Sequence, residues 1–244
     1  MSPVRTILSR ELRSYFATPI AYVFIIIFLL FLNLFAFQLG RIYENGQSDL
    51  SGFFMFHPWL YVVLVPAVSM RLWAEERNSG SIELLLTQPI TLWQAVLAKF
   101  LAGWLFIAIA LALTFPIWIT INYLGSPDNG TIVASYLGSW LMAGAYLAIG
   151  SFMSAITRSQ VIAFVLTFFV GFMLVMAGFP IVLDWVRDWA WPWLVDGLAA
   201  LAIYSHFESI VKGVLDLRDV LYFALLGGFF LLASTVVLDA RKSS

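Results

Sequence analysis

Long runs of apolar residues without any charged side chain dominate this chain. Each run approaches or exceeds the roughly 20 residues that a membrane-spanning helix needs. The runs are Ala21–Gly40, Phe53–Met70, Phe100–Ser126, Thr131–Thr157, Ser159–Leu183 and Val220–Leu238. They predict an all-α membrane protein with six transmembrane helices in one domain over residues 1–244. A β-barrel is excluded because barrel strands are short and alternate in polarity.

Composition agrees with this pattern. The chain is 62% hydrophobic and 11% charged, with a mean hydropathy of +0.93, whereas a soluble domain carries about a quarter charged residues. The absence of cysteine excludes disulfides, thiolate chemistry and Cys-ligated metals. Two histidines are too few for a His-rich metal site, and we expect neither a cofactor in this chain nor a nucleic-acid partner.

The basic residues predict the orientation in the membrane. An N-terminus inside the cell places nine of them in the cytoplasm and four outside, which agrees with the positive-inside rule. The nine are Arg5, Arg10, Arg13, Arg71, Arg77, Lys99, Arg158, Arg241 and Lys242, and the four are Arg41, Arg187, Lys212 and Arg218. We therefore expect a multi-pass protein of the bacterial cytoplasmic (inner) membrane with both termini cytoplasmic.

Residues 1–18 have the pattern of an amphipathic interfacial helix. Pro3 is a favourable first helical residue, and the apolar residues recur at helical spacing. These are Val4, Ile7, Leu8, Leu12, Tyr15 and Phe16, and the basic residues fall elsewhere around the helix. The pattern fits either simple membrane anchoring or an added role in gripping a partner.

Residues 74–91 form the long polar interruption of the first half of the chain. Gly80 is expected to end one helix in a left-handed conformation, and Ser81 can cap a short apolar helix over residues 82–87. Pro89 ends that helix, and Thr91 with Gln94 forms a capping box that opens the next span. The short helix predicts a docking site for a soluble partner; the alternative is an interfacial helix lying on lipid.

Residues 184–219 are the second informative interruption. Trp185, Trp189, Trp191 and Trp193 stand among charged residues, which is typical of the lipid headgroup level. Ser205 and Glu208 suggest a capping box, and Asp216 is expected to cap the last span. We expect short outer helices that form either an aromatic belt or an outer gate. His57 is interpreted as an interfacial residue.

Several kinds of chemistry have no sequence support. The chain has no G-x-x-x-x-G-K-[ST] motif for ATP phosphates, no H-E-x-x-H and no G-x-S-x-G. The apolar runs also lack the acidic residues that ion-coupled transporters use, which disfavours a secondary carrier. We expect a protein that is not an enzyme and that is either passive or driven by another subunit.

At this point the residues resemble a known family over essentially the whole chain. The sequence is similar to permease subunits of the ABC-2 class of ATP-binding-cassette transporters, most closely the gliding-motility and nitrous-oxide-reductase-maturation type. One matching stretch runs from Glu75 to Pro89 and is followed by Lys99-Phe100, and the other runs from His206 to Asp219. The resemblance implies a coupling helix between spans two and three and short outer helices between spans five and six.

The resemblance also implies partners. These are two copies of an ATP-binding subunit that holds ATP and Mg, and a second permease that is identical or homologous. An auxiliary membrane subunit with a periplasmic domain is a further candidate, and the lipid bilayer surrounds the assembly. The expected function is export of an unidentified substrate. The alternative is a non-transporting scaffold or mechanotransmission subunit driven by the same type of ATPase.

The resemblance assigns two sets of site residues. Residues 82–87 would seat in a groove of the ATPase, while Glu75, Glu76, Arg77 and Glu83 would fix their register. The full coupling set is Glu75, Glu76, Arg77, Gly80, Ile82, Glu83, Leu84, Leu85, Leu86 and Pro89. The candidates for an outer gate are Trp193, His206, Phe207 and Glu208.

Overall fold

The computed structural model describes residues 3–38, 49–81 and 90–240, and every regular element in these ranges is a helix. The prediction of an all-α fold is therefore confirmed for this part of the chain. In chain order the helices are α1 (Pro3–Ala17), α2 (Pro19–Gln38), α3 (Ser51–Phe54), α4 (His57–Ser69), α5 (Arg71–Ser79), α7 (Leu92–Ala112), α8 (Phe115–Leu124), α9 (Asn129–Ile156), α10 (Gln160–Met176), α11 (Pro180–Arg187), α12 (Pro192–Ala200), α13 (Ile203–Val211) and α14 (Leu217–Ala240).

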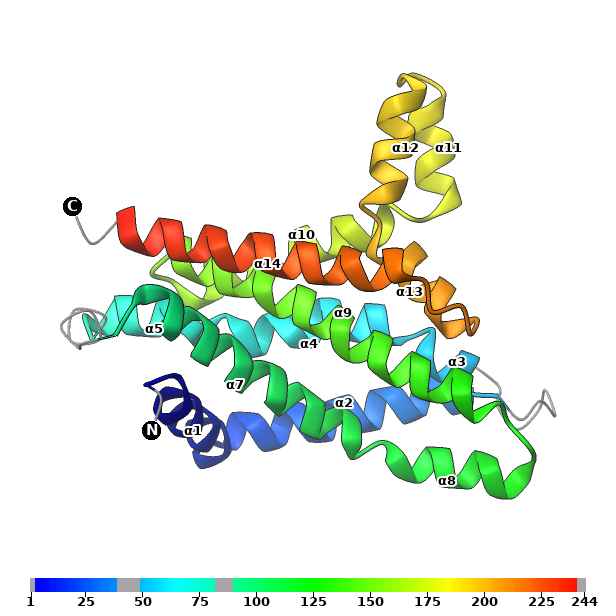
Figure 1. The fold of residues 1–244 in the computed structure, drawn as a ribbon, viewed down its shortest axis with the longest axis horizontal. Helices are drawn as coiled ribbons and strands as arrows, with labels where there is room; N and C mark the ends of the chain where they lie inside the picture. Colours follow the sequence, from blue (N-terminus) through cyan, green and yellow to red (C-terminus); the bar gives the residue numbers. More distant parts are fainter. Residues whose placement is uncertain (1–2, 39–48, 82–89, 241–244) are drawn as a thin grey trace.

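The long helices lie roughly side by side in one bundle (Figure 1). Helix α1, helix α5 and the C-terminal end of α14 lie at one end of it, which we call the terminal end. Helices α3 and α13 lie toward the other end, which we call the opposite end. The bundle thus presents two different faces to the two sides of a membrane.

Helix α9 is the centre of the bundle, since α4, α5, α7, α10, α13 and α14 all pack against it. Its small residues allow these close approaches. A Cβ atom on Gly144 would lie 2.8 Å from Nε1 of Trp104, whose ring stacks on Trp140 at 4.1 Å. Ala148, the other member of the predicted small-residue pair, is fully buried.

Five helical segments are long and apolar enough to cross a membrane. They are Ala21–Gln38, Ser51–Ser79, Leu92–Leu124, Asn129–Ile156 and Leu217–Ala240. Two bent helix pairs, α10 with α11 and α12 with α13, would raise the number to seven if each were one span. Length and composition therefore allow five to seven spans, a range that includes the predicted six.

The predicted span over Ser159–Leu183 is not one straight helix. Helix α10 ends at Met176, and α11 begins at Pro180 after a bend of 78°. Proline lacks a backbone N–H and therefore cannot continue the hydrogen-bond ladder of the preceding helix. The outer segment consequently begins at Pro180, before the predicted boundary at residue 184.

Helices α11 and α12 form an arm (Pro180–Ala200) that projects from the side of the bundle (Figure 1). Helix α11 buries none of its residues, and α12 buries only Val195. The chain then returns to the bundle as α13. The predicted Ser205–Glu208 capping box is wrong, because α13 begins at Ile203 and no side chain caps it.

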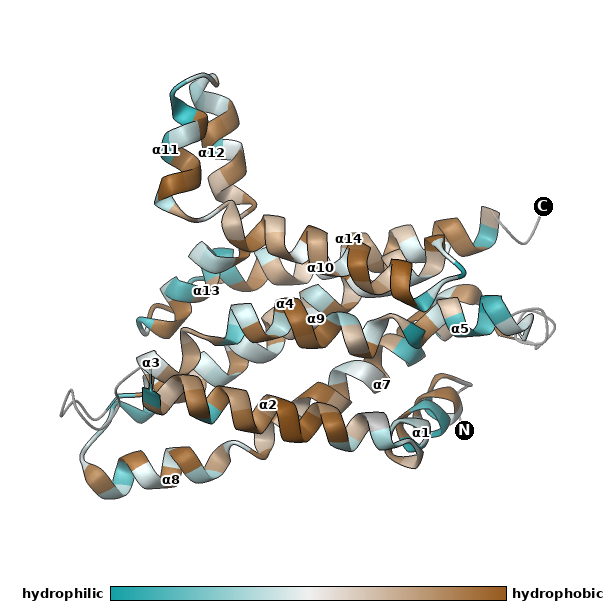
Figure 2. Ribbon diagram, turned by 180° about the vertical axis from the view of Figure 1, so that it is seen from behind, coloured by the Kyte–Doolittle hydropathy of each residue, from teal (hydrophilic) through white to brown (hydrophobic). Residues whose placement is uncertain are grey.

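The outside of the bundle is apolar, as Figure 2 shows along α2, α10 and α14. Ile26 on α2, Val161 on α10 and Leu225 on α14 are 61%, 70% and 70% exposed. Polar residues gather instead in α1, α5 and α11. This distribution fits a bundle surrounded by lipid, where water is absent along the sides and present at the ends.

Candidate functional site

The strongest concentration of buried polar contacts among the described residues is at the terminal end, around α5. Of the predicted coupling residues, Glu75, Glu76, Arg77 and Gly80 belong to the described part of the chain. Gly80 ends α5 in the left-handed conformation with φ 73°, as predicted. The remaining coupling residues, Ile82, Glu83, Leu84, Leu85, Leu86 and Pro89, lie outside the described residues.

Helix α5 is separated from α4 by a break at Met70, and Ser154 of α9 fills this break. The Ser154 Oγ accepts hydrogen bonds from the backbone N–H groups of Trp73 and Ala74, at 3.0 and 2.9 Å, and donates one to the carbonyl of Met70 at 2.9 Å. One hydroxyl thus satisfies two N–H groups at the start of α5 and a carbonyl at the end of α4, all of which the break between the helices can leave without partners.

A second hydroxyl on the same face of α9 strengthens this contact. Nε1–H of Trp73 donates to Oγ of Ser151 at 3.1 Å, and the Trp73 side chain is fully buried. Gly150 makes the close approach possible, because a Cβ atom there would overlap the Oγ of Ser69. The start of α5 is therefore fixed to α9 by both hydrogen bonds and steric fit.

Arg77 fixes the other end of α5 to α9. Its Nη1 donates to the carbonyls of Ala155 at 2.6 Å and Thr157 at 3.3 Å. These carbonyls belong to the C-terminus of α9, where a cation is stabilised by the helix dipole and by unpaired carbonyl oxygens. Arg77, predicted to set the register of a docked partner, is thus placed against this chain's own backbone.

Lys99 of α7 joins three helices at the terminal end. Its Nζ lies 2.8 Å from Oε1 of Glu76 on α5 and 3.6 Å from Oε1 of Glu11 on α1. The same ammonium lies 5.1 Å from the centre of the Trp73 ring, within the range of a cation–π interaction. Lys99 is only 3% exposed, so both carboxylates are held by a nearly buried charge.

Glu75 and Glu76 therefore have different environments although they are neighbours in sequence. Glu76 faces inward to Lys99, and its other carboxylate oxygen is buried without a hydrogen-bond partner among the described residues. The side chain of Glu75 is 49% exposed and pairs with Arg71 one turn earlier at 2.8 Å. Of the two, Glu75 is the carboxylate that a soluble partner could reach.

Helix α1 packs on α7 through an aromatic cluster. The Tyr15 ring stacks on Phe106 at 5.1 Å, and the Phe16 ring meets the same Phe106 edge-on at 5.7 Å. Burial raises the pKa of the Tyr15 hydroxyl, and the nearby Glu11 carboxylate raises it further. Ile7 is also buried, so α1 is a packed part of the bundle in addition to any contact with lipid.

A cleft of about 570 Å³ lies between α1 and α5. Its lining carries three basic and three acidic side chains together with hydroxyl groups, including those of Tyr15 and Ser79. Such a mixed polar surface suits contact with water or a polar partner and does not suit lipid tails. The described part of the chain contains no group of three or more His, Cys, Asp or Glu side chains that could hold a metal ion.

The start of α7 adjoins this polar cluster. Thr91 and Gln94 form the predicted capping box, in which the Gln94 N–H donates to Oγ1 of Thr91 at 3.3 Å and the Thr91 N–H donates to Oε1 of Gln94 at 3.2 Å. Gly80 and Thr91 thus fix where the flanking helices stop and start. The segment between them is the predicted docking helix.

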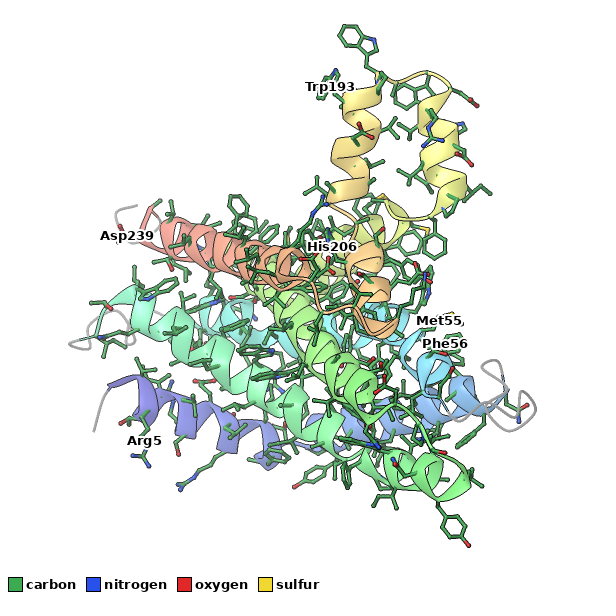
Figure 3. The ribbon with its side chains drawn as sticks, turned by 45° about the vertical axis from the view of Figure 1, so that its right-hand side comes forward. Arg5, Met55, Phe56, Trp193, His206 and Asp239 are labelled. Atoms are coloured by element: carbon green, nitrogen blue, oxygen red, sulfur yellow. The ribbon has the colours of Figure 1, made fainter. Side chains whose placement is uncertain are left out.

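Of the four gate candidates, Trp193 lies apart from the other three, which follow one another on α13. Trp193 is 64% exposed and lies at the tip of the arm, whereas His206 lies at its root (Figure 3). Phe207 is 1% exposed and inserts into the bundle. Glu208 is partly exposed and pairs with Lys212 of the same helix at 2.7 Å. His57, interpreted as interfacial, is fully buried with its ring 6.5 Å from that of Phe207.

Sequence reasoning did not assign Glu11, Lys99, Ser151 or Ser154 to the coupling site. A signal for the two serines was present, because they stand three residues apart on one face of the otherwise apolar C-terminal third of α9. Lys99 is a lone cation at the start of an apolar run, where surface exposure is the ordinary outcome. Only the fold shows that two carboxylates from distant segments meet it.

Comparison of the sequence with those of known proteins identifies a family. The profile of a family described as ABC-2 family transporter protein matches residues 46–238. A curated relative, heme exporter protein B of Paracoccus denitrificans (strain Pd 1222), is 35% identical over 100 residues. This similarity covers 41% of the present chain and 44% of the relative, so the chain spans less than half the length of that relative.

Proposed function

This chain belongs to the ABC-2 family of transporter proteins, and we propose that it is the membrane permease subunit of an ABC exporter. Its energy would come from ATP that a separate ATP-binding subunit hydrolyses. That subunit, and not this chain, would bind ATP and Mg. This chain would be a transport subunit without enzymatic activity of its own.

The proposal is supported mainly by the attachment of α5 to the rest of the bundle through hydrogen bonds and ion pairs. Helix α5 directly precedes the predicted docking helix. Ser151, Ser154 and the carbonyls bound by Arg77 tie it to α9, and Lys99 ties it to α7 and α1. A displacement applied next to α5 would therefore reach four helices together. Such a rigid connection is what a permease needs to convert closure of a partner into a change of its own shape.

The proposed orientation follows from the positions of the two ends. Helix α1 and the end of α14 share the terminal end (Figure 1), which supports an even number of membrane crossings. We propose six crossings, made by the five long segments and by α10, which is long and apolar enough to span only together with the bent α11. The excess of basic residues at this end supports a cytoplasmic location for both termini. The membrane would then be the inner membrane of a bacterium.

The proposed assembly contains two ATP-binding subunits and a second permease, identical or homologous. An auxiliary subunit with a periplasmic domain is a further candidate. Glu75, which is exposed beside the predicted docking helix, would contact the ATPase together with residues 82–87. The partial similarity to a protein named as an exporter supports outward transport.

Co-purification tests the proposal directly. The tagged chain is expressed with a candidate ATP-binding-cassette ATPase from the same genome, and both are expected in one complex whose ATPase activity depends on the permease. Leu85→Asp is expected to abolish the complex while the variant still inserts in the membrane. The control is Leu215→Asp, which places the same charge at an exposed site near the opposite end and should leave the complex intact.

The outcomes separate the candidates. A normal complex with normal ATPase activity in Leu85→Asp would contradict the proposed docking helix. ATPase stimulation by the chain without movement of any cargo across a reconstituted bilayer would favour the alternative of a mechanotransmission subunit. Cargo movement driven by an ion gradient without nucleotide would contradict the proposal as a whole.

A further inference from the structure

Away from the coupling site, His206 and Asp219 form the one buried ion pair among the described residues of the opposite end. Nδ1 of His206 lies 2.6 Å from Oδ1 of Asp219, and the two side chains are 10% and 8% exposed. His206 is on α13, and Asp219 is in the first turn of α14, where the helix dipole stabilises an anion. The pair therefore joins two helices that enter the bundle from different directions.

The second ring nitrogen of His206 also faces an oxygen. Nε2 lies 3.1 Å from the carbonyl of Ala200, the last residue of α12. A carbonyl can only accept, so Nε2 must carry a proton to form this hydrogen bond. The contact with Asp219 needs another proton between Nδ1 and Oδ1. Both hydrogen bonds thus exist together only when the pair of side chains holds two protons. If Asp219 is an ionised carboxylate, both protons are on the ring of His206, which is then an imidazolium cation.

Tyr222 of α14 completes the arrangement. Its ring stacks on that of His206 with centres 4.0 Å apart and planes 19° apart, a geometry that favours a cationic ring over a neutral one. Its hydroxyl donates to the carbonyl of Leu201 at 2.6 Å. The carbonyls of Ala200 and Leu201, which form the corner between α12 and α13, are thus both held by side chains.

This corner is where the arm meets the bundle. Figure 3 shows His206 at the root of the arm and Trp193 at its tip. Beyond the corner, α13 inserts Ile203, Phe207 and Ile210, each at most 1% exposed. Gly138 of α9 makes room for this insertion, because a Cβ atom there would lie 2.8 Å from Cγ2 of Ile210. Helix α13 therefore closes the bundle at the opposite end.

We propose that His206 is a positioning residue that, when doubly protonated, fixes α13 and the root of the arm to α14, so that the opposite end stays closed. Loss of one proton leaves Nε2 or Nδ1 facing an oxygen without a hydrogen between them. One of the two connections then fails, and the corner loosens. A role of this corner as the gate for cargo rests on the proposed function. The attachment of the corner by His206 does not depend on that function.

Among the charged groups near His206, Asp219 is the one that contacts its ring. On α13 itself, Glu208 and Lys212 pair with each other. Helix α10 has no titratable residue, and α9 contributes Tyr146, whose buried hydroxyl makes no hydrogen bond among the described residues. Asp216 accepts from the backbone N–H of Arg218, and Asp196 is exposed on α12. The direction of the pH effect is therefore set by the His206–Asp219 pair: acidification closes the corner and alkalinisation loosens it.

The first test measures the protons themselves in this chain purified alone and placed in lipid, without cargo or nucleotide. The chain has two histidines, so histidine-selective ¹⁵N labelling gives two ring spectra, and His206→Gln assigns them. We expect the His206 ring to carry protons on both nitrogens at the acidic end of the range from about pH 5 to about pH 8, in which imidazole changes its charge. A ring that carries one proton throughout this range would overturn the proposal.

The second test measures the position of the arm. Because the chain has no cysteine, spin labels can be placed cleanly at Gly197→Cys on α12, where a Cβ atom meets nothing within 4 Å, and at Leu225→Cys on α14, which is 70% exposed. We expect one narrow distance distribution at acidic pH and a reversible broadening at alkaline pH. His206→Gln and Asp219→Asn should each abolish this pH dependence.

Glu208→Gln provides the matched control, since it removes an exposed ion pair from the same helix and should keep the pH dependence. The same pH-dependent broadening in His206→Gln as in the parent chain would overturn the proposal. So would a distribution that does not change with pH in the parent chain. These readouts need no transport activity, so their failure is distinct from a failure of the proposed function.

Discussion

Nζ of Lys99 lies 2.8 Å from a carboxylate oxygen of Glu76 at the point where α7 passes the beginning of the polar segment. Lys99 is 3% exposed, whereas the side chains of Glu76 and Glu11 each keep about a fifth of their exposure, 21% and 19%. The cation is therefore fixed by the fold, and the two anions are arranged around it.

Lys99→Met should destabilise the protein, because it leaves two neighbouring carboxylates without their shared cation. Removing one partner of a fully buried pair costs about 3–5 kcal/mol, and we expect about 2 kcal/mol here because both acids remain partly hydrated. Thermal unfolding in detergent measures the change. Arg71→Gln, which removes the more exposed ion pair of α5, should cost less than about 1 kcal/mol.

Combining Lys99→Met with Glu11→Gln and Glu76→Gln should recover most of this stability, because no buried charge is then left without a partner. Arg10 also loses its contact with Glu11, but its side chain is 55% exposed and remains hydrated. The link between α1 and α5 would still be weaker. In the complex, we expect the recovered variant to bind the ATPase but to stimulate it less than the parent chain. Full stimulation by this variant would contradict a role of Lys99 in transmission.

Ser154→Ala should destabilise the start of α5. The change removes the acceptor of the buried N–H groups of Trp73 and Ala74, and an unsatisfied buried group costs about 1–3 kcal/mol. Ser234→Ala serves as the control, since that hydroxyl bonds only to the carbonyl of Phe230 within its own helix. Equal melting temperatures of the two variants would argue against Ser154 as the fastening point.

Gly150→Ala should force α9 and α4 apart, because the new methyl group would overlap the hydroxyl of Ser69. Overpacking of this kind costs about 1–3 kcal/mol. Gly228→Ala on α14 meets nothing within 4 Å and should cause no loss of stability. Gly150→Ala with Ser69→Gly should recover part of the loss, which unfolding measurements on the three variants would show.

Tyr15 should contribute to the dependence of stability on alkaline pH. Its pKa is raised by burial first and by the Glu11 carboxylate second, so the folded protein keeps the hydroxyl protonated where an unfolded chain would lose its proton. The contribution is complete below about pH 10, the ordinary value for tyrosine, and is lost as the pH rises above it. Tyr15→Phe should flatten the fall of melting temperature above this pH; an unchanged slope would contradict the prediction.

The arrangement at the opposite end separates features that the sequence grouped together. Trp193 and His206 both come from the polar stretch before the last helix, and both were candidates for one gate. In the fold, the arm carries Trp193 away from the bundle while α13 carries Phe207 into it. The bend at Pro180 and the return at Leu201 decide this, and neither bend angle can be derived from hydropathy.

The sequence by itself determined the class of protein and the positions of most helices. Hydropathy fixes which segments can lie in lipid, because the transfer of each residue into lipid depends mainly on that residue. Local hydrogen bonding fixes where helices begin and end, so Gly80 and the Thr91–Gln94 pair were predictable from a few neighbouring residues. The family signature likewise marked the segment at which a partner is expected to dock.

Only the tertiary structure decided how the polar residues are paired. Trp73 and Ser154 are 81 positions apart, and the carboxylates around Lys99 come from two other helices. Hydrogen bonds and ion pairs form only between side chains that are in direct contact. Residues distant in sequence therefore become partners only when the helices pack together. For that reason the sequence predicted where a partner would dock, and only the fold showed which side chains attach the preceding helix, α5, to the rest of the bundle.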